Sequence, residues 1–172
     1  TIPGYAPSPL LEAPTAAAAL GAARLLVKRE TERFGLPAFK ILGASWATAR
    51  ALTELLAQRG LPSPTLDEGI AALVEAVIPL RPMTLCCATD GNHGRAVARM
   101  ANWLGFSSRI YVPEDMAPAR IAAIESEGAV VIRLPGTYDD AIARSAEDAA
   151  EDCLVISDTS WPGYAAIPQW VI

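Results

Sequence analysis

Apolar positions in the first half of the chain recur at helical spacing. Between residues 40 and 59 they fall every three or four positions, which predicts an amphipathic helix closed by Gly60. The same spacing predicts a second helix over 66–77. A short apolar run predicts a strand at 25–27, and the proline-rich residues 1–14 predict an extended arm.

The second half follows a different pattern, in which short apolar runs alternate with amphipathic stretches. The runs predict strands at 83–88, 108–113, 129–134 and 153–157. The stretches between them predict helices at 95–104, 118–126 and 138–152. Strands that alternate with helices form a parallel sheet covered by helices, so the predicted fold class is α/β. Ligands of such sheets gather beyond the carboxyl ends of the strands.

Composition narrows the possible partners. Hydrophobic residues make up 52% of the 172 residues, which is enough for a packed core. The net charge of −5 gives no basic surface, so we expect no nucleic-acid partner. No apolar run approaches the roughly 20 residues that span a bilayer, so we expect no membrane partner.

Targeting signals and cysteines bear on the location of the protein. The N-terminal residues lack the basic and apolar pattern of a secretory signal. Cys86, Cys87 and Cys153 show no metal-ligand spacing, and we expect free buried thiols and no metal site. We therefore expect a cytoplasmic protein.

Lys40 is the first residue that suggests chemistry. It follows the apolar residues 36–39, which would shield its amine from water at the start of a helix. A lysine in such a setting can form a Schiff base with an aldehyde cofactor. Local context alone leaves open the common alternative, a solvated surface lysine.

The polar segment 89–94 follows a predicted strand and precedes a predicted helix. Its glycines allow close approach of the backbone to a ligand, and a helix start attracts anions. An ordinary strand-to-helix turn is the alternative, in which Asn92 is a turn residue. His93 is the one histidine of the chain, and it is either a general base or a histidine satisfied within the turn.

Asp90 and Asp158 each lie just beyond a predicted strand. Either aspartate could cap the helix that follows it, a role that this residue type performs well. If both converge on one cleft, they would suit a cationic substrate and could exchange protons with it. The acidic residues at 139–140 and 147–152 are expected to form a solvated helix face.

Three segments together, 33–43, 88–95 and 157–164, resemble the diaminopropionate ammonia-lyase family. This family belongs to the fold-type II pyridoxal-phosphate enzymes, with tryptophan synthase β as a relative. The resemblance implies a three-layer αβα architecture that is truncated here, because the chain looks like an N-terminal fragment. It also implies that residues 1–90 begin the large cofactor domain, 91–157 form a small α/β domain, and 158–172 return to the large domain.

The resemblance also implies roles for single residues. Lys40 would be the Schiff-base lysine of pyridoxal 5′-phosphate, and Asn92 would bond the phenolic oxygen of the cofactor ring. Asp90 and Asp158 would be the catalytic acid–base pair. The substrate, a small amino acid, would bind through Thr89, Asp90, Gly91, Asn92 and His93.

The implied reaction is elimination of ammonia from 2,3-diaminopropionate, which gives pyruvate and ammonia. The glycine-rich loop that holds the cofactor phosphate in the family does not occur in this sequence, so we expect the fragment to be inactive alone. The full-length protein is expected to be a homodimer. Two alternatives stay open: a lyase resembling serine and threonine dehydratases, and a non-catalytic α/β remnant.

Overall fold

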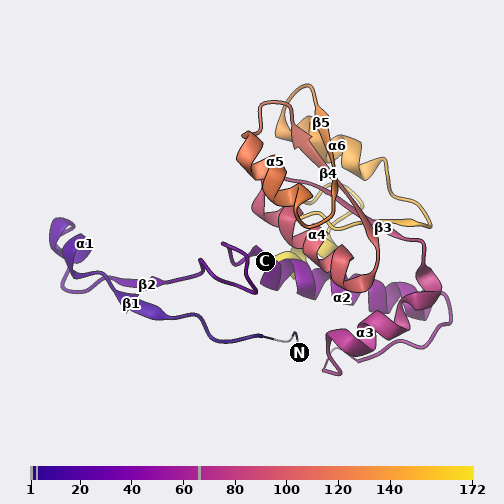
Figure 1. Ribbon diagram of the computed structural model, residues 1–172, viewed down its shortest axis with the longest axis horizontal. Helices are drawn as coiled ribbons and strands as arrows, with labels where there is room; N and C mark the ends of the chain where they lie inside the picture. Colours follow the sequence, from indigo (N-terminus) through magenta and orange to yellow (C-terminus); the bar gives the residue numbers. More distant parts are fainter. Residues whose placement is uncertain (1, 3, 66) are drawn as a thin grey trace.

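A parallel sheet with helices on both faces forms the body of the protein, and a thin arm projects from it (Figure 1). The computed structural model describes residues 2, 4–65 and 67–172. Four strands make up the sheet in the order β5-β4-β3-β6, and every neighbouring pair is parallel. The strands are β3 (Thr84–Ala88), β4 (Ser107–Pro113), β5 (Val130–Leu134) and β6 (Cys153–Val155). The predicted α/β class is thereby confirmed.

Helices cover the two faces of this sheet and complete three layers (Figure 1). On one face lie α4 (Asn92–Leu104) and α5 (Pro118–Glu125), with α2 (Lys40–Gln58) packed against α4. On the other face lies α6 (Tyr138–Ala146). Successive β3 side chains point to opposite faces, as strand geometry requires. Cys87 therefore faces the α4 side, whereas Ala88 packs with Ala141 of α6.

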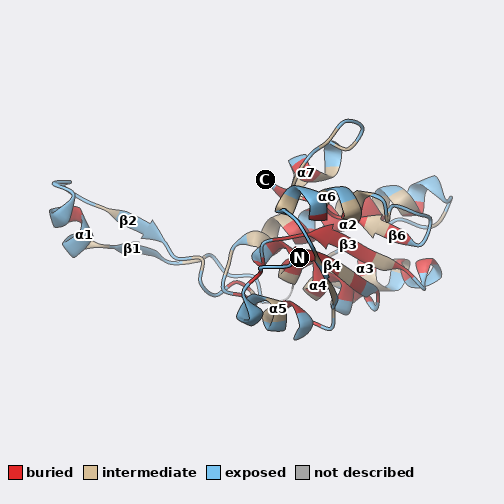
Figure 2. Ribbon diagram, turned by 90° about the horizontal axis from the view of Figure 1, so that it is seen from above, coloured by how far each residue is buried: buried red, intermediate tan, exposed pale blue. Residues whose placement is uncertain are grey.

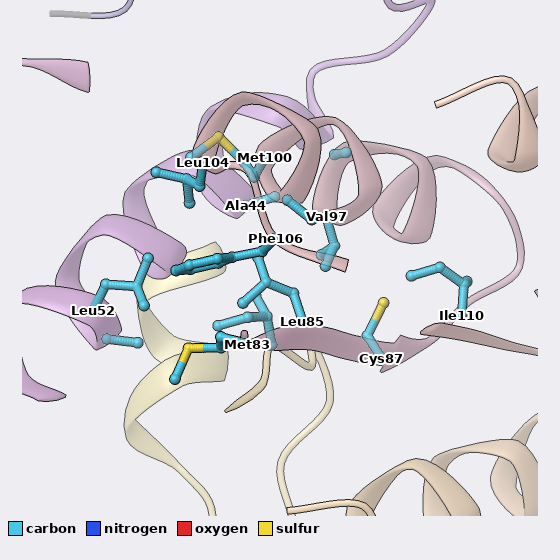
Figure 3. Close-up of a cluster of buried hydrophobic side chains, with 14 of the residues drawn as sticks. Ala44, Leu52, Met83, Leu85, Cys87, Val97, Met100, Leu104, Phe106 and Ile110 are labelled. Atoms are coloured by element: carbon cyan, nitrogen blue, oxygen red, sulfur yellow. The ribbon is translucent and has the colours of Figure 1, made fainter. Parts of the chain in front are cut away.

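The main core lies between the sheet and the layer of α2 and α4. Leu85 and Cys87 of β3 meet Val97 and Met100 of α4 there, and Leu52 of α2 closes the cluster (Figure 3). Figure 2 shows this interior as buried ribbon surrounded by exposed helix faces. Burial of such apolar side chains is the main stabilising contribution to a domain of this size.

Three further helical segments complete the body. They are α3 (Ile70–Ala76), the 3-10 helix η1 (Ile78–Leu80) and α7 (Ala166–Val171). α7 crosses α2 at Gly43, where an added Cβ would lie 1.9 Å from the carbonyl oxygen of Val171. A glycine is therefore required for this close contact between helices.

The arm is a two-stranded antiparallel ribbon with a short helix at its tip (Figures 1 and 2). Its elements are β1 (Leu10–Glu12), α1 (Pro14–Ala19) and β2 (Leu26–Lys28), and both strands are exposed along their length. Helix α1 begins at Pro14, and no side chain caps its start.

Two predicted helices are longer than the observed ones. The predicted start at residue 66 lies outside the described residues, and α3 begins at Ile70. The helix predicted over 138–152 ends at Ala146, because Asp148 turns inward to pair with Arg109 and Arg144. Residues 147–152 are therefore not one solvated helix face.

The predicted division of the chain at residue 90 stays a prediction. Strand β3, from the first predicted unit, pairs with β4 and β6 of the second unit in one sheet. Among the described residues, no helix combines the length and the apolar character needed to cross a membrane.

The order of the strands places a switch point beside β3. The chain proceeds from β3 through β4 to β5 in one direction, and α6 then returns it to β6 on the other side of β3. In open α/β sheets the crevice at such a switch point, beyond the carboxyl ends of the strands, is where ligands bind. Asp90 follows β3 and Asp158 follows β6, so both lie beside this crevice.

Candidate functional site

A cavity of about 560 Å³ lies at the carboxyl ends of β3 and β6. Its walls come from the first turns of α2, α4 and α6 and from α5. Every residue predicted for the site lines it: Lys40, Thr89, Asp90, Gly91, Asn92, His93 and Asp158. The fold therefore brings together residues that lie far apart in the sequence.

The segment before Lys40 is anchored to α4. Arg33 and Leu36 exchange two backbone hydrogen bonds of 2.8 Å around Phe34 and Gly35, whose φ angles are 52° and 74°. Positive φ at both central residues is the signature of a type I′ turn. Arg99 of α4 donates a hydrogen bond of 3.0 Å to the carbonyl of Phe34. The turn thus fixes where α2 begins.

Lys40 is the first residue of α2, and its Nζ lies 2.8 Å from Oδ2 of Asp158. The Lys40 side chain is 33% exposed and that of Asp158 15%, so the ion pair lies at the cavity wall. The expectation that apolar neighbours shield this amine is wrong: Phe39 is 56% exposed, and the partner of the amine is a carboxylate.

Asp158 also contacts two other elements. Its Oδ1 lies 3.4 Å from the hydroxyl of Tyr138, and its Oδ2 lies 3.9 Å from Nδ1 of His93. Burial raises the pKa of Asp158, but His93 and the ammonium of Lys40 outweigh this effect and hold the pKa below its usual range. Burial together with the charge of Asp158 raises the pKa of Tyr138 to about 12.

His93 is buried, and its two ring nitrogens have different surroundings. Nε2 lies 2.7 Å from the carbonyl oxygen of Ile156, which can only accept, so Nε2 carries the proton. Nδ1 has no hydrogen-bond partner among the described residues and lies on the side of Asp158. Burial lowers the pKa of His93 and favours the neutral ring. Nε2 of His93 is therefore satisfied by the protein itself, as the turn interpretation states, whereas Nδ1 is available to accept a hydrogen bond or a proton.

Thr89 shapes the start of α4. Its Oγ1 accepts hydrogen bonds of 2.9 Å from the backbone N–H groups of Gly91 and Gly94. These two N–H groups are therefore not free for a substrate carboxylate. The N–H groups of Asn92 and His93, in the first turn of α4, have no acceptor within the helix. The side chain of Asn92 is exposed at the cavity.

Asp90 lies at the cavity mouth and is exposed. It does not cap α4, because Gly91, with φ of 139°, is the residue that precedes the helix. Arg120 of α5 donates a hydrogen bond of 3.1 Å to the carbonyl of Asp90 and thereby ties α5 to this segment.

Sequence reasoning missed Tyr138 and Arg120 as cavity residues. A signal existed for Tyr138, because it begins a helix shortly after the carboxyl end of β5, where ligand-facing residues are expected. Nothing in the local sequence marked Arg120, whose side chain reaches the cavity from the exposed side of α5.

A family profile described as "Pyridoxal-phosphate dependent enzyme" matches residues 1–171. The diaminopropionate ammonia-lyase of Escherichia coli (strain K12) is 39% identical over 172 residues, which are 99% of this chain and 42% of that protein. The enzyme of the same name from Salmonella typhimurium is 33% identical, with 99% and 42% covered.

A solved structure agrees with these sequence relatives. The crystal structure of the Escherichia coli diaminopropionate ammonia lyase in complex with D-serine superposes with a TM-score of 0.84 at 38% identity. The match covers 98% of this chain and 42% of that chain. The chain thus spans about 42% of the length of the curated relatives that it matches.

Proposed function

The chain belongs to the pyridoxal-phosphate dependent enzyme family, and on that premise we propose that the whole protein is an ammonia-lyase. With one water molecule, it would convert 2,3-diaminopropionate to pyruvate and two molecules of ammonia. The observation that carries this proposal is the convergence of Lys40, Asp90 and Asp158 on one cavity. Carboxylates suit a diamino substrate, because the departing amine must gain a proton as its bond breaks.

Pyridoxal phosphate suits the amine at the wall of this cavity. The Lys40 amine faces a space that an aldehyde can enter, and its partner Asp158 is charged at neutral pH. Lys40 would hold the aldehyde carbon, and Asn92 would contact the phenolic oxygen of the ring. When bound, the cofactor supplies an electron sink for negative charge that develops at the substrate Cα.

The residues of the chain would bind the substrate and move its protons. The N–H groups of Asn92 and His93 would donate hydrogen bonds to the substrate carboxylate at the start of α4, where the helix dipole favours an anion. Asp158, with its lowered pKa, is an available base at neutral pH. Lys40, Asp90 and Asp158 are the three candidates for the group that takes the Cα proton. Acids that follow different strands would allow both D and L substrates.

A dehydratase acting on serine or threonine is the alternative enzyme. It needs no second carboxylate for a hydroxyl leaving group, so Asp90 would then be dispensable. The cavity contains both Asp90 and Asp158, which favours the diamino substrate. Replacement of Asp90 by Asn should therefore impair turnover of diaminopropionate far more than turnover of serine.

A non-catalytic remnant is the second alternative. Such a protein would have no need for the ion pair between Lys40 and Asp158 inside a cavity. We favour an enzyme because the lysine, the acids and the start of α4 are all in place.

Borohydride trapping tests the proposal directly. The whole protein is incubated with pyridoxal phosphate, reduced and digested, and the labelled lysine is identified by mass spectrometry. This chain contains two lysines, Lys28 on the exposed arm and Lys40, so Lys28 is an internal control. Label on Lys40 and pyruvate release from diaminopropionate are the expected results. No label on Lys40, together with no pyruvate from diaminopropionate, serine or threonine, would support the remnant.

We also propose that the whole protein is a cytoplasmic homodimer. The three free, buried cysteines are consistent with a reducing compartment, and the family resemblance supports the dimer. Light scattering of the purified whole protein measures its mass in solution, and a monomer mass would refute the dimer.

A further inference from the structure

Strand β6 is an edge strand of the described sheet. Contacts along its outer edge hold the backbone that leads to Asp158. Ile156, just after β6, donates a backbone hydrogen bond of 2.8 Å to Cys86 of β3. Backbone hydrogen-bonding groups alternate in direction along an extended chain. The carbonyl of Val155 and the N–H of Ser157 therefore point to the opposite side, where the described sheet has no further strand.

The hydroxyl of Tyr164 occupies this position. It donates a hydrogen bond of 2.8 Å to the carbonyl of Val155 and accepts one of 2.9 Å from the N–H of Ser157. In a parallel sheet, one residue of a neighbouring strand bonds this same pair of groups, on either side of the residue that it faces. A single side-chain oxygen thus takes the place of a neighbouring strand.

Tyr164 is itself held firmly in place. Trp161 and Tyr164 exchange backbone hydrogen bonds of 3.1 and 2.9 Å around Pro162 and Gly163, whose φ is 87°. Proline followed by a glycine with positive φ is typical of a type II turn. The two aromatic rings stack at 4.0 Å with an angle of 9°, and both pack against the cluster that contains Cys86.

The residues around Asp158 are fixed from three directions. The Tyr164 hydroxyl holds Val155 and Ser157 on the outer edge, and Nε2 of His93 holds Ile156 from the side of α4. On the other side of Asp158, the Ser157 hydroxyl donates a hydrogen bond of 3.0 Å to the carbonyl of Thr159 and accepts one of 3.0 Å from the N–H of Thr159. The carboxylate of Asp158 therefore extends from a backbone with little freedom to shift.

We propose that Tyr164 is a positioning residue that keeps the Asp158 carboxylate opposite Lys40. The inference rests on the proposed function, since it assigns Tyr164 to the alignment of that acid. Tyr164 does not line the cavity, and its hydroxyl bonds the backbone of Val155 and Ser157, so it acts through residues 155–157. Displacement of a catalytic group by about 1 Å can reduce a rate by roughly 100-fold.

The test is Tyr164→Phe in the whole protein, which removes the hydroxyl and keeps the ring. We expect kcat for diaminopropionate to fall roughly 10- to 100-fold with little change in KM. The groups that face Asp158 are Lys40, His93 and Tyr138. Once Asp158 shifts away from Lys40 and His93, its pKa rises, so the acidic limb of the pH–rate profile should move to higher pH.

Tyr111→Phe is the matched control. Its buried hydroxyl likewise donates a hydrogen bond, here to the carboxylate of Asp148, but neither Tyr111 nor Asp148 lines the cavity. We expect Tyr111→Phe to lose stability and to retain the wild-type pH profile. Trp161→Leu, which removes the stacked ring and keeps the Tyr164 hydroxyl, should act like Tyr164→Phe with a smaller effect.

A crystal structure of cofactor-free Tyr164→Phe gives a readout independent of activity. The distance between Lys40 Nζ and Asp158 Oδ2, now 2.8 Å, should lengthen beyond hydrogen-bonding range. An unchanged distance with wild-type kcat and pH profile would overturn the inference. If the wild-type protein releases no pyruvate, the proposed function fails, and the measured distance still decides whether Tyr164 positions Asp158.

Discussion

The amine of Lys40 and the carboxylate of Asp158 lie 2.8 Å apart, although 118 residues separate them in the chain. This ion pair joins the start of α2 to the segment that follows β6, at the wall of the cavity. It gives each group a partner, and any reaction of the amine must release the carboxylate from that pairing.

Lys40→Arg separates the structural role of this lysine from its chemical role. Arginine can keep the ion pair with Asp158 but offers no amine for an aldehyde. We expect pyruvate release to fall to background while the denaturant midpoint stays near wild type. Lys40→Ala should lose activity and stability together, because it leaves Asp158 without its cation. Substantial activity in Lys40→Arg would contradict the role of Lys40.

Asp158→Asn tests the charge of the acid at nearly constant shape. General acid–base groups contribute roughly 100-fold or more to a rate, so we expect kcat on diaminopropionate to fall by about that factor. Assays with D and L substrates identify which isomer depends on this carboxylate. Asp90→Asn is the companion variant, and equal effects of both changes on both isomers would argue against separate roles for the two acids.

Asp148→Asn tests the network that ends α6. The carboxylate of Asp148 is 8% exposed and pairs with Arg109 and Arg144, so loss of its charge should cost about 2–3 kcal/mol of unfolding free energy. Urea unfolding of the whole protein measures this. Glu147→Gln is the control, since the Glu147 side chain is 70% exposed and should contribute little.

The same carboxylate gives stability a defined dependence on pH. Burial raises the pKa of Asp148, but hydrogen bonds from Tyr111 and the two arginines lower it by a larger amount, so the net shift of the pKa is downward. Its contribution is therefore complete above the unfolded pKa of about 3.9 and is lost as the pH falls through the lower folded pKa. The difference in stability between wild type and Asp148→Asn should stay constant near neutrality and shrink below about pH 4. A difference that grows on acidification would contradict this sign.

Gly94→Ala tests the packing at the start of α4. A Cβ at this position would lie 2.4 Å from Cγ2 of Thr89 and 2.7 Å from Cγ2 of Ile110, so we expect a loss of about 1–3 kcal/mol. Thr89 would also be displaced from the cavity, and KM should rise. Gly43→Ala, which meets the backbone of α7, should destabilise the protein without raising KM.

The sequence was sufficient for the sheet because its signals are local. The apolar runs that became β3 and β4 are bounded by turns, and helices between them require parallel pairing. Asp90 and Asp158 could be placed at one edge for the same reason. The contact of Asp158 with Lys40 could not, since no local rule relates positions 118 residues apart.

Other features escaped because they depend on side-chain hydrogen bonds and ion pairs that no pattern of residue types predicts. Asp148 looked like one more solvated acid, and only Arg109 on β4 explains why α6 ends before it. The sequence does not show that the Thr89 hydroxyl accepts hydrogen bonds from the N–H groups of both Gly91 and Gly94. The hydroxyl of Tyr164 gave no local signal at all.

The outer edge of β6 is closed to strand addition along most of its length. Ala150 exchanges backbone hydrogen bonds of 3.1 and 3.2 Å with Cys153, and the Tyr164 hydroxyl occupies the groups of Val155 and Ser157. Open strand edges recruit other chains and promote aggregation. Among the described strands, β5 forms the opposite edge, where Val130 is 63% exposed. Any strand that extends this sheet, from the same polypeptide or another, therefore has to pair along β5.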